Sequence, residues 1–253
     1  MIKYLGSKRR LVPAIGAIAA AFGARTAVDL FTGTTRVAQA LKQLGMHTTA
    51  VDTARYAEVF ATTYIATDAN AVDPGEVAAA LDHLAGEPDL DGYVTEVFSR
   101  QARFFHPANG RRIDAIRLAI DRDFSSSPLR PLLLTALLEA ADRVDSTTGV
   151  QMAYLKSWAP RALNRIELRA PQLLPGHGDA VRGDACEVVR ALPPVDLAYL
   201  DPPYNQHRYF TNYHVWETLV ASDAPEHYGV ACKRADARSL ETRTAFDSRR
   251  TIA

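Results

Sequence analysis

Residues 195–204 read Val195-Asp196-Leu197-Ala198-Tyr199-Leu200-Asp201-Pro202-Pro203-Tyr204, a short apolar strand that runs into a carboxylate, two prolines and an aromatic ring. The prolines lack N–H donors and hold the backbone in a non-helical bend, so nearby carbonyl groups can face a ligand. Ligands of open α/β sheets bind at the carboxyl ends of the strands. We therefore expect Asp201 to supply an acceptor and Tyr204 a stacking face, which suits a planar heterocycle with an exocyclic amino group.

A β-α-β unit precedes this strand, near the N-terminus. Residues 26–31 predict a buried strand, Gly33 lies in a turn, residues 35–44 predict a helix, and residues 47–51 predict a second strand that ends at Asp52. Such units build parallel sheets with right-handed crossovers. The sequence therefore predicts an α/β protein with a doubly wound sheet.

The middle of the chain has a different pattern. Residues 56–141 read as one Ala-rich helix after another, and residues 144–171 lose clear periodicity before the sheet pattern returns. A two-stranded fragment cannot bury both of its faces alone. We therefore expect residues 1–55 and 176–253 to form one catalytic core, with residues 56–175 inserted as a helical subdomain. The alternative is two unrelated small domains.

Composition limits the class of protein further. The chain has 253 residues, and its 29 basic side chains balance its 29 acidic ones, whereas a nucleic-acid-binding chain often has a basic excess. Cys186 and Cys232 form neither a disulfide framework nor a metal-ligand spacing, and no metal is predicted. Because no run of about 18 apolar residues and no leader pattern occurs, we expect a cytoplasmic protein that does not contact a membrane.

Four motifs follow one another along the chain: Lys3-Tyr4-Leu5-Gly6-Ser7-Lys8, Asp29-Leu30-Phe31-Thr32-Gly33, Arg182-Gly183-Asp184-Ala185 and Asp201-Pro202-Pro203-Tyr204. Taken in this order, they resemble those of S-adenosylmethionine-dependent DNA amino-methyltransferases of the alpha group, chiefly the adenine-specific ones. Asp52 follows the Gly turn by about twenty residues, as the ribose-binding acid does in dinucleotide-binding folds. The resemblance covers essentially the whole chain. The chain departs from the family at Tyr4, where better-known members have Trp, and at Thr35, where many have a second Gly.

The resemblance implies a Rossmann-like methyltransferase sheet with S-adenosyl-L-methionine as cofactor. Catalysis would fall to Asp201, Pro202 and Tyr204. Cofactor binding would fall to residues from all the matched motifs: Tyr4, Lys8, Asp29, Gly33, Asp52, Asp184 and Asp201. For DNA contact, the polar and basic residues of the insert are the candidates: Arg111, Arg112, Thr147, Tyr154 and Lys156.

The implied activity is transfer of a methyl group to the amino group of adenine in DNA, in restriction-modification or related DNA marking. Its partners would be double-stranded DNA with a flipped adenine and a restriction endonuclease of the same system. Two alternatives stay open: methylation of the cytosine amino group or of RNA, and a truncated, inactive remnant that binds cofactor or DNA.

The C-terminal part differs from the family pattern. The 49 residues after Tyr204 (253 minus 204) predict one helix at residues 212–221 and a short candidate strand at residues 228–232. We therefore expect the family's C-terminal strands to be missing and the strand that ends at Asp201 to lie at or near a sheet edge. Apolar side chains from that strand and from residues 215–220 would then be exposed and would favour self-association.

Overall fold

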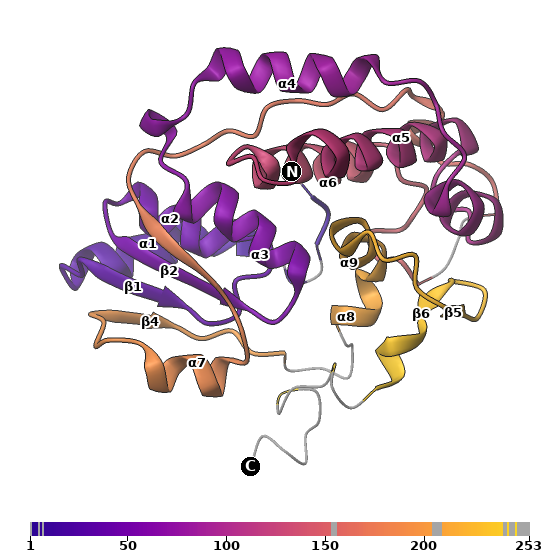
Figure 1. Cartoon of the computed structure of the whole chain (residues 1–253). Helices are drawn as coiled ribbons and strands as arrows, with labels where there is room; N and C mark the ends of the chain where they lie inside the picture. The colour runs from indigo at the N-terminus through magenta and orange to yellow at the C-terminus, as the bar shows by residue number, and fades with distance from the viewer. Residues whose placement is uncertain are drawn as a thin grey trace. The chain divides into compact units, whose positions relative to one another are not determined.

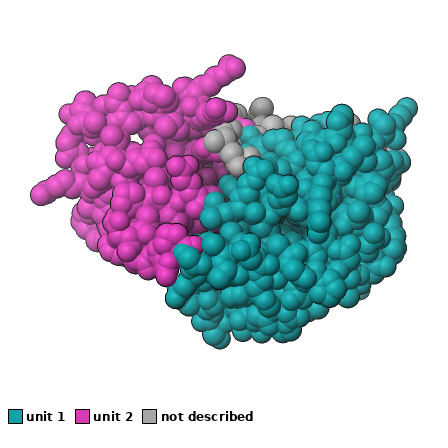
Figure 2. All heavy atoms as spheres, turned by 90° about the horizontal axis from the view of Figure 1, so that it is seen from above, with its two compact units in different colours: residues 1–5, 75–170, 205–253 teal, residues 6–74, 171–204 magenta. Residues whose placement is uncertain are grey.

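The computed structural model describes residues 2–4, 6, 8–152, 156–203, 209–239, 242 and 246. Its contacts divide the chain into two compact units (Figure 2). Unit 1 contains residues 1–5, 75–170 and 205–253, and unit 2 contains residues 6–74 and 171–204. Among the helices of the described part, none has the length and the apolar character needed to cross a membrane.

Unit 2 is built around a parallel four-stranded sheet (Figure 1). Its strands are β1 (Thr26–Asp29), β2 (His47–Asp52), β3 (Gly178–Arg182) and β4 (Leu197–Tyr199), in the spatial order β3-β2-β1-β4. In the register of the sheet, Val28 of β1 lies opposite Thr49 of β2 and opposite Ala198 of β4. The predicted α/β fold with a parallel sheet is therefore confirmed.

Helices cover this sheet on both faces. They are α1 (Val12–Ala21), α2 (Arg36–Gln43), α3 (Arg55–Ala61) and α7 (Ala185–Ala191), with the short helices η1 (Lys8–Arg10), η2 (Thr62–Ala66) and η3 (Ala69–Ala71). The chain moves one way along the sheet through α2 and the other way through α7, so right-handed crossovers place these two helices on opposite faces. Core residues of α1, α2 and β1 pack together with half-buried residues of β4: Ala19, Ala27, Val37, Leu41, Leu197 and Tyr199.

A buried lysine holds the end of η2 in unit 2. Lys42 Nζ donates to the carbonyl oxygens of Tyr64, Ile65 and Thr67 at 3.2, 2.9 and 2.8 Å. Carbonyl groups at the end of a helix lack partners within it, and a cation there satisfies them. Burial lowers the pKa of Lys42.

The strand that ends at Asp201 lies at an edge of the described sheet, as the sequence predicts, because β4 pairs with β1 and stands last in the order. Leu200, just beyond β4, is 61% exposed, and Val189 of α7 is 47% exposed. The expectation that residues 215–220 add to this apolar surface is wrong. Val215 and Leu219 are buried in unit 1.

Unit 1 is mainly helical. Its elements are α4 (Pro74–Gly86), η4 (Val94–Gln101), α5 (Pro107–Phe124), α6 (Arg130–Arg143), η5 (Pro160–Leu163), α8 (Tyr209–Asn212), α9 (His214–Ala221), β5 (His227–Tyr228), β6 (Lys233–Arg234) and η6 (Ala235–Arg238). Helix α9 packs against α6 and β6, with Trp216 buried. Residues 205–253 therefore group with the helical region, whereas the sequence places residues 176–253 with the sheet.

The predicted strand at residues 228–232 is wrong except at Tyr228, because residues 229–232 form a turn. Strands β5 and β6 pair as an antiparallel hairpin, with Tyr228 opposite Lys233, and the residues between them form its turn. Gly229 has a positive φ of 68°, which glycine adopts readily. Apolar composition alone did not separate a strand from a turn here.

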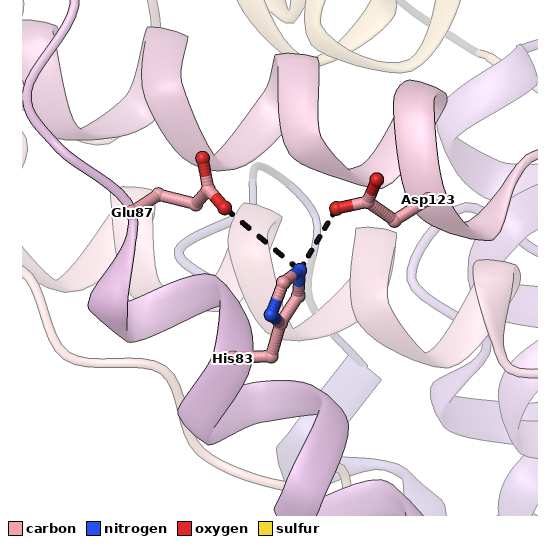
Figure 3. A group of neighbouring side chains, drawn as sticks. All are labelled: His83, Glu87 and Asp123. Atoms are coloured by element: carbon pink, nitrogen blue, oxygen red, sulfur yellow. Dashed lines mark hydrogen bonds and ion pairs between the residues drawn. The ribbon is translucent and has the colours of Figure 1, made fainter.

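An ion-pair network joins α4 to the end of α5 (Figure 3). His83 Nε2 lies 2.8 Å from Asp123 Oδ2 and 3.8 Å from Glu87 Oε1. Arg122 Nη2 lies 2.8 Å from Glu87 Oε1 and 2.5 Å from Asp123 Oδ2. Hydrogen bonds from Arg122 lower the pKa of both carboxyls. His83, Glu87 and Asp123 are residue types that bind divalent metals. However, the positively charged Arg122 already pairs with both carboxylates.

Candidate functional site

Four carboxylates lie at the carboxyl edge of the sheet in unit 2. Asp29 ends β1 and Asp52 ends β2, while Asp184 and Asp201 follow β3 and β4. Because all four strands are parallel and ordered β3-β2-β1-β4, these side chains succeed one another along one edge as Asp184, Asp52, Asp29 and Asp201. The structure thus brings together acidic residues that the sequence singles out from three separate motifs.

The turn after β1 is tied to the end of β2. The Gly33 N–H donates to Asp52 Oδ2 at 2.9 Å, and the Thr32 N–H donates to the Val51 carbonyl at 3.0 Å. The other carboxylate oxygen of Asp52 accepts from the Ala54 N–H at 3.0 Å. The acid and the Gly turn, which the sequence links only by spacing, are therefore in direct contact.

Thr35 takes the left-handed backbone conformation, with φ of 60° and ψ of 17°, that a second glycine would adopt. This conformation costs a residue with a side chain about 1–2 kcal/mol. Two hydrogen bonds hold the threonine, because its Oγ1 donates to the Thr34 carbonyl at 2.7 Å and accepts from Gln39 Nε2 at 2.8 Å. Thr35 therefore takes, with a side chain, a backbone conformation that glycine adopts without this cost.

Asp29 and Asp52 are carboxylates in a poorly hydrated place. The pKa of Asp29 is raised to about 7, mainly by burial and to a smaller extent by the nearby Asp52. Burial also raises the pKa of Asp52, while hydrogen bonds from Ala54 and Gly33 oppose this rise. Asp29 is 1% exposed and accepts from the Phe31 N–H at 3.4 Å, so its carboxyl lies beneath the turn and supports it.

Asp201 is paired with Lys8. The Lys8 Nζ lies 2.6 Å from Asp201 Oδ2, and both side chains are partly exposed. The sequence points to each residue separately but gives no sign of the pair, because the two motifs are far apart along the chain. Pro202 and Pro203, which follow Asp201, are half-buried. Tyr204 lies outside the described residues.

The remaining cofactor candidates lie in different settings. Asp184 is the N-cap of α7, and its side chain accepts from the Cys186 N–H at 2.8 Å. Its expected contact with a cofactor stays a prediction. Tyr4 belongs to unit 1, where its ring stacks on that of Tyr213.

Two of the residues expected to contact DNA have structural positions. Arg112 is buried, and its guanidinium donates to the carbonyl oxygens of Leu84, Ala85 and Glu87 at the end of α4. Thr147 is also buried. Arg112 caps a helix and Thr147 donates to Asp145 at 2.5 Å, and the expected contact of these two side chains with DNA stays a prediction.

Arg111 and Lys156 remain candidates for DNA contact. Arg111 is partly exposed, with its Nε 3.7 Å from Asp89 Oδ2, and Lys156 is exposed. Tyr154 lies outside the described residues, so its predicted role is not assessed. We therefore keep Arg111 and Lys156 as the described basic positions for later tests of DNA binding.

A parallel sheet with a Gly turn and a row of acids at its carboxyl edge is typical of Rossmann-like folds that bind nucleotides, and it is consistent with the methyltransferase fold. Residues 4–245 match the family model of the D12 class N6 adenine-specific DNA methyltransferases. The chain belongs to this family.

Three curated relatives illustrate the similarity. The chain is 36% identical over 132 residues to type II methyltransferase M.FokI of Planomicrobium okeanokoites, which covers 50% of the chain and 20% of that protein. It is 30% identical over 207 residues to type II methyltransferase M.NlaIII of Neisseria lactamica, covering 77% of the chain and 60% of the relative. With modification methylase StsI of Streptococcus sanguinis it shares 27% identity over 270 positions, covering 100% of the chain and 41% of the relative. The chain thus spans between a fifth and three fifths of these relatives. No solved structure matches it significantly.

Proposed function

We propose that the chain transfers a methyl group from S-adenosyl-L-methionine to the amino nitrogen of adenine in DNA. The observation that carries this proposal is the carboxylate of Asp201, which Lys8 holds directly after edge strand β4 and before two prolines. An acceptor fixed at the carboxyl end of a strand suits a ligand that presents N–H donors.

Methyl transfer to adenine requires hydrogen-bond acceptors beside its amino group. The lone pair of adenine's amino nitrogen is delocalised into the ring, so this nitrogen is a weak nucleophile. The Asp201 carboxylate and the Pro202 carbonyl would accept its hydrogens and favour a tetrahedral nitrogen whose lone pair can attack the methyl group. The methyl donor would supply the methyl group, with the nitrogen–carbon bond forming as the carbon–sulfur bond breaks and S-adenosyl-L-homocysteine leaving, and the Asp201 carboxylate would take the nitrogen's proton and pass it to solvent. The protein contributes alignment and preorganised electrostatics, with Lys8 restraining the carboxylate.

The residues of the sheet edge fit a nucleoside-containing methyl donor. Asp52 is an acid at a strand end, where it can accept from both hydroxyls of a ribose. Gly33 allows close approach of the backbone to a ligand, and Asp184 can accept from an adenine amino group. Asp29 would support the turn from below, while Lys8 adds to the set that the family motifs suggest.

DNA is the proposed partner. A base inside a duplex cannot reach a carboxylate at the edge of a sheet, so adenine must leave the stack. Tyr204 would stack on the flipped base, a contact that contributes roughly 1–3 kcal/mol at other base-stacking sites. A restriction endonuclease of the same system, and a second copy of the chain paired at β4, are further proposed partners.

Replacement of Asp52 by Ala is expected to weaken S-adenosylmethionine binding by about 1.5–3 kcal/mol, the scale of hydrogen bonds to a charged group. Isothermal titration calorimetry measures this change directly. Asp179→Ala is the matched control, because Asp179 is an exposed aspartate within β3 and not at its carboxyl end. An unchanged dissociation constant in Asp52→Ala would show that this acid merely holds the turn. The titration thus tests whether S-adenosylmethionine is the methyl donor. Nucleoside analysis of DNA treated with the chain tests whether adenine is the methyl acceptor.

A further inference from the structure

Three tyrosines form a stack in unit 1. The ring of Tyr4 lies 4.5 Å from that of Tyr213 at an interplanar angle of 17°, and 5.5 Å from that of Tyr209 at 24°. Tyr209 begins α8 and Tyr213 directly precedes α9, where the Tyr213 N–H donates to the Tyr209 carbonyl at 3.0 Å. Tyr213 is almost fully buried. The N-terminal segment therefore packs against the first turn that the structure describes after the Asp201 motif.

The residue next to Tyr4 is fixed by charge. The Lys3 N–H donates to Asp142 Oδ2 at 3.1 Å, and Lys3 Nζ donates to Asp145 Oδ1 at 2.7 Å. Asp145 is buried and also accepts from Arg161 Nη2 at 2.8 Å. Both the backbone and the side chain of Lys3 are held, so the neighbouring Tyr4 ring has little freedom to move away from its stack.

The same two segments are also joined in unit 2. The chain passes from unit 1 to unit 2 between residues 5 and 6, and it returns to unit 1 between residues 204 and 205. Lys8 lies shortly after the first of these two points in the sequence, and Asp201 lies shortly before the second. The two side chains form an ion pair. The N-terminal segment thus makes two contacts with this part of the chain. Lys8 contacts Asp201, before the chain returns to unit 1, and Tyr4 contacts Tyr209 and Tyr213, after that return.

We infer that Tyr4 is a positioning residue for methyl transfer, one that acts through its stack on Tyr209 and Tyr213 and not by contact with the cofactor. The inference rests on the proposed role of Asp201. Stacked rings and a partly buried ion pair hold the start of α8 against the N-terminal segment, and Lys8 holds the Asp201 carboxylate itself. A small displacement of a reacting group is enough to lower a rate about 100-fold.

The test compares Tyr4→Leu with Tyr4→Phe, which keeps the ring. Tyr4→Leu is expected to lower kcat on adenine-containing DNA by about 10- to 100-fold while the dissociation constant of S-adenosylmethionine stays within about threefold. Tyr4→Phe should retain most of the activity. Tyr209→Leu should lower kcat similarly, and the double variant should be no slower than the worse single one. Phe22→Leu, which truncates a ring that is 77% exposed at the end of α1, should leave kcat unchanged.

Two results would overturn the inference. One is a weaker S-adenosylmethionine affinity of Tyr4→Leu with kcat unchanged at saturation, since the ring would then contact the cofactor. The other is an unchanged rate of hydrogen exchange at the amides of residues 209–217 in Tyr4→Leu, a measurement that needs no activity. If the wild-type chain transfers no methyl group, the proposed function fails, and this exchange measurement alone decides whether Tyr4 orders α8.

Discussion

Replacement of Asp201 by Ala is expected to abolish methyl transfer, lowering kcat by about 10³-fold, while the affinity for S-adenosylmethionine stays within about threefold. The reason is that the carboxylate follows β4 at the edge of the sheet and is held by Lys8, as an acceptor for a substrate amino group must be. The loss belongs to the chemical step, because the proposed ribose acceptor, Asp52, lies two strands away in the sheet order. Single-turnover transfer of labelled methyl to duplex DNA measures it.

Asp201→Asn is the matched variant for this prediction. It keeps the size of the side chain and one acceptor oxygen but loses the charge that pairs with Lys8. We expect an intermediate rate for Asp201→Asn and the largest loss for Asp201→Ala. If Asp201→Ala kept a rate within about tenfold of the wild type, the catalytic assignment of this residue would fail.

Replacement of Asp29 by Asn is expected to stabilise the unliganded chain increasingly as pH rises. The folded chain holds the pKa of Asp29 at about 7, above its ordinary value of 3.8, because the carboxyl is buried. The proton therefore stabilises the folded state fully below pH 4, and this stabilisation is lost as pH rises to about 7. One pKa unit corresponds to about 1.4 kcal/mol, so the loss amounts to about 4 kcal/mol between pH 4 and pH 8.

Asparagine cannot ionise, so Asp29→Asn escapes this loss. Chemical denaturation at pH 5 and pH 8 measures the difference in free energy of unfolding between Asp29→Asn and the wild type. This difference should shift by roughly 2–3 kcal/mol in favour of Asp29→Asn from pH 5 to pH 8. Asp82→Asn, which removes an exposed carboxylate from α4, is the control for a change of net charge. A difference between Asp29→Asn and the wild type that does not vary with pH would show that Asp29 is not held protonated by burial.

Much of the sheet and its edge could be predicted from the sequence. Each strand is short and either ends in an acid or is followed by one two residues later. The parallel β-α-β pattern brings those ends to one edge. Asp29, Asp52 and Asp201 could therefore be assigned to a common edge without coordinates. The resemblance to a family supplied their roles, and spacing alone did not.

Pairings between distant segments could not be predicted. Nothing local in the sequence indicates that Lys8 binds Asp201 or that Tyr4 stacks on Tyr213, because such contacts depend on the path of the chain between them. The helix-capping position of Arg112 could not be predicted for a related reason. A guanidinium serves a phosphate or the carbonyl groups at a helix end equally well, and its burial decides which.

The most direct test of the central claim is nucleoside analysis by mass spectrometry of duplex DNA incubated with the chain and S-adenosylmethionine. The proposed function predicts N6-methyladenine with the wild type and its absence with Asp201→Ala. N4-methylcytosine as the product, methylation of RNA alone, or equal N6-methyladenine from both proteins would contradict it.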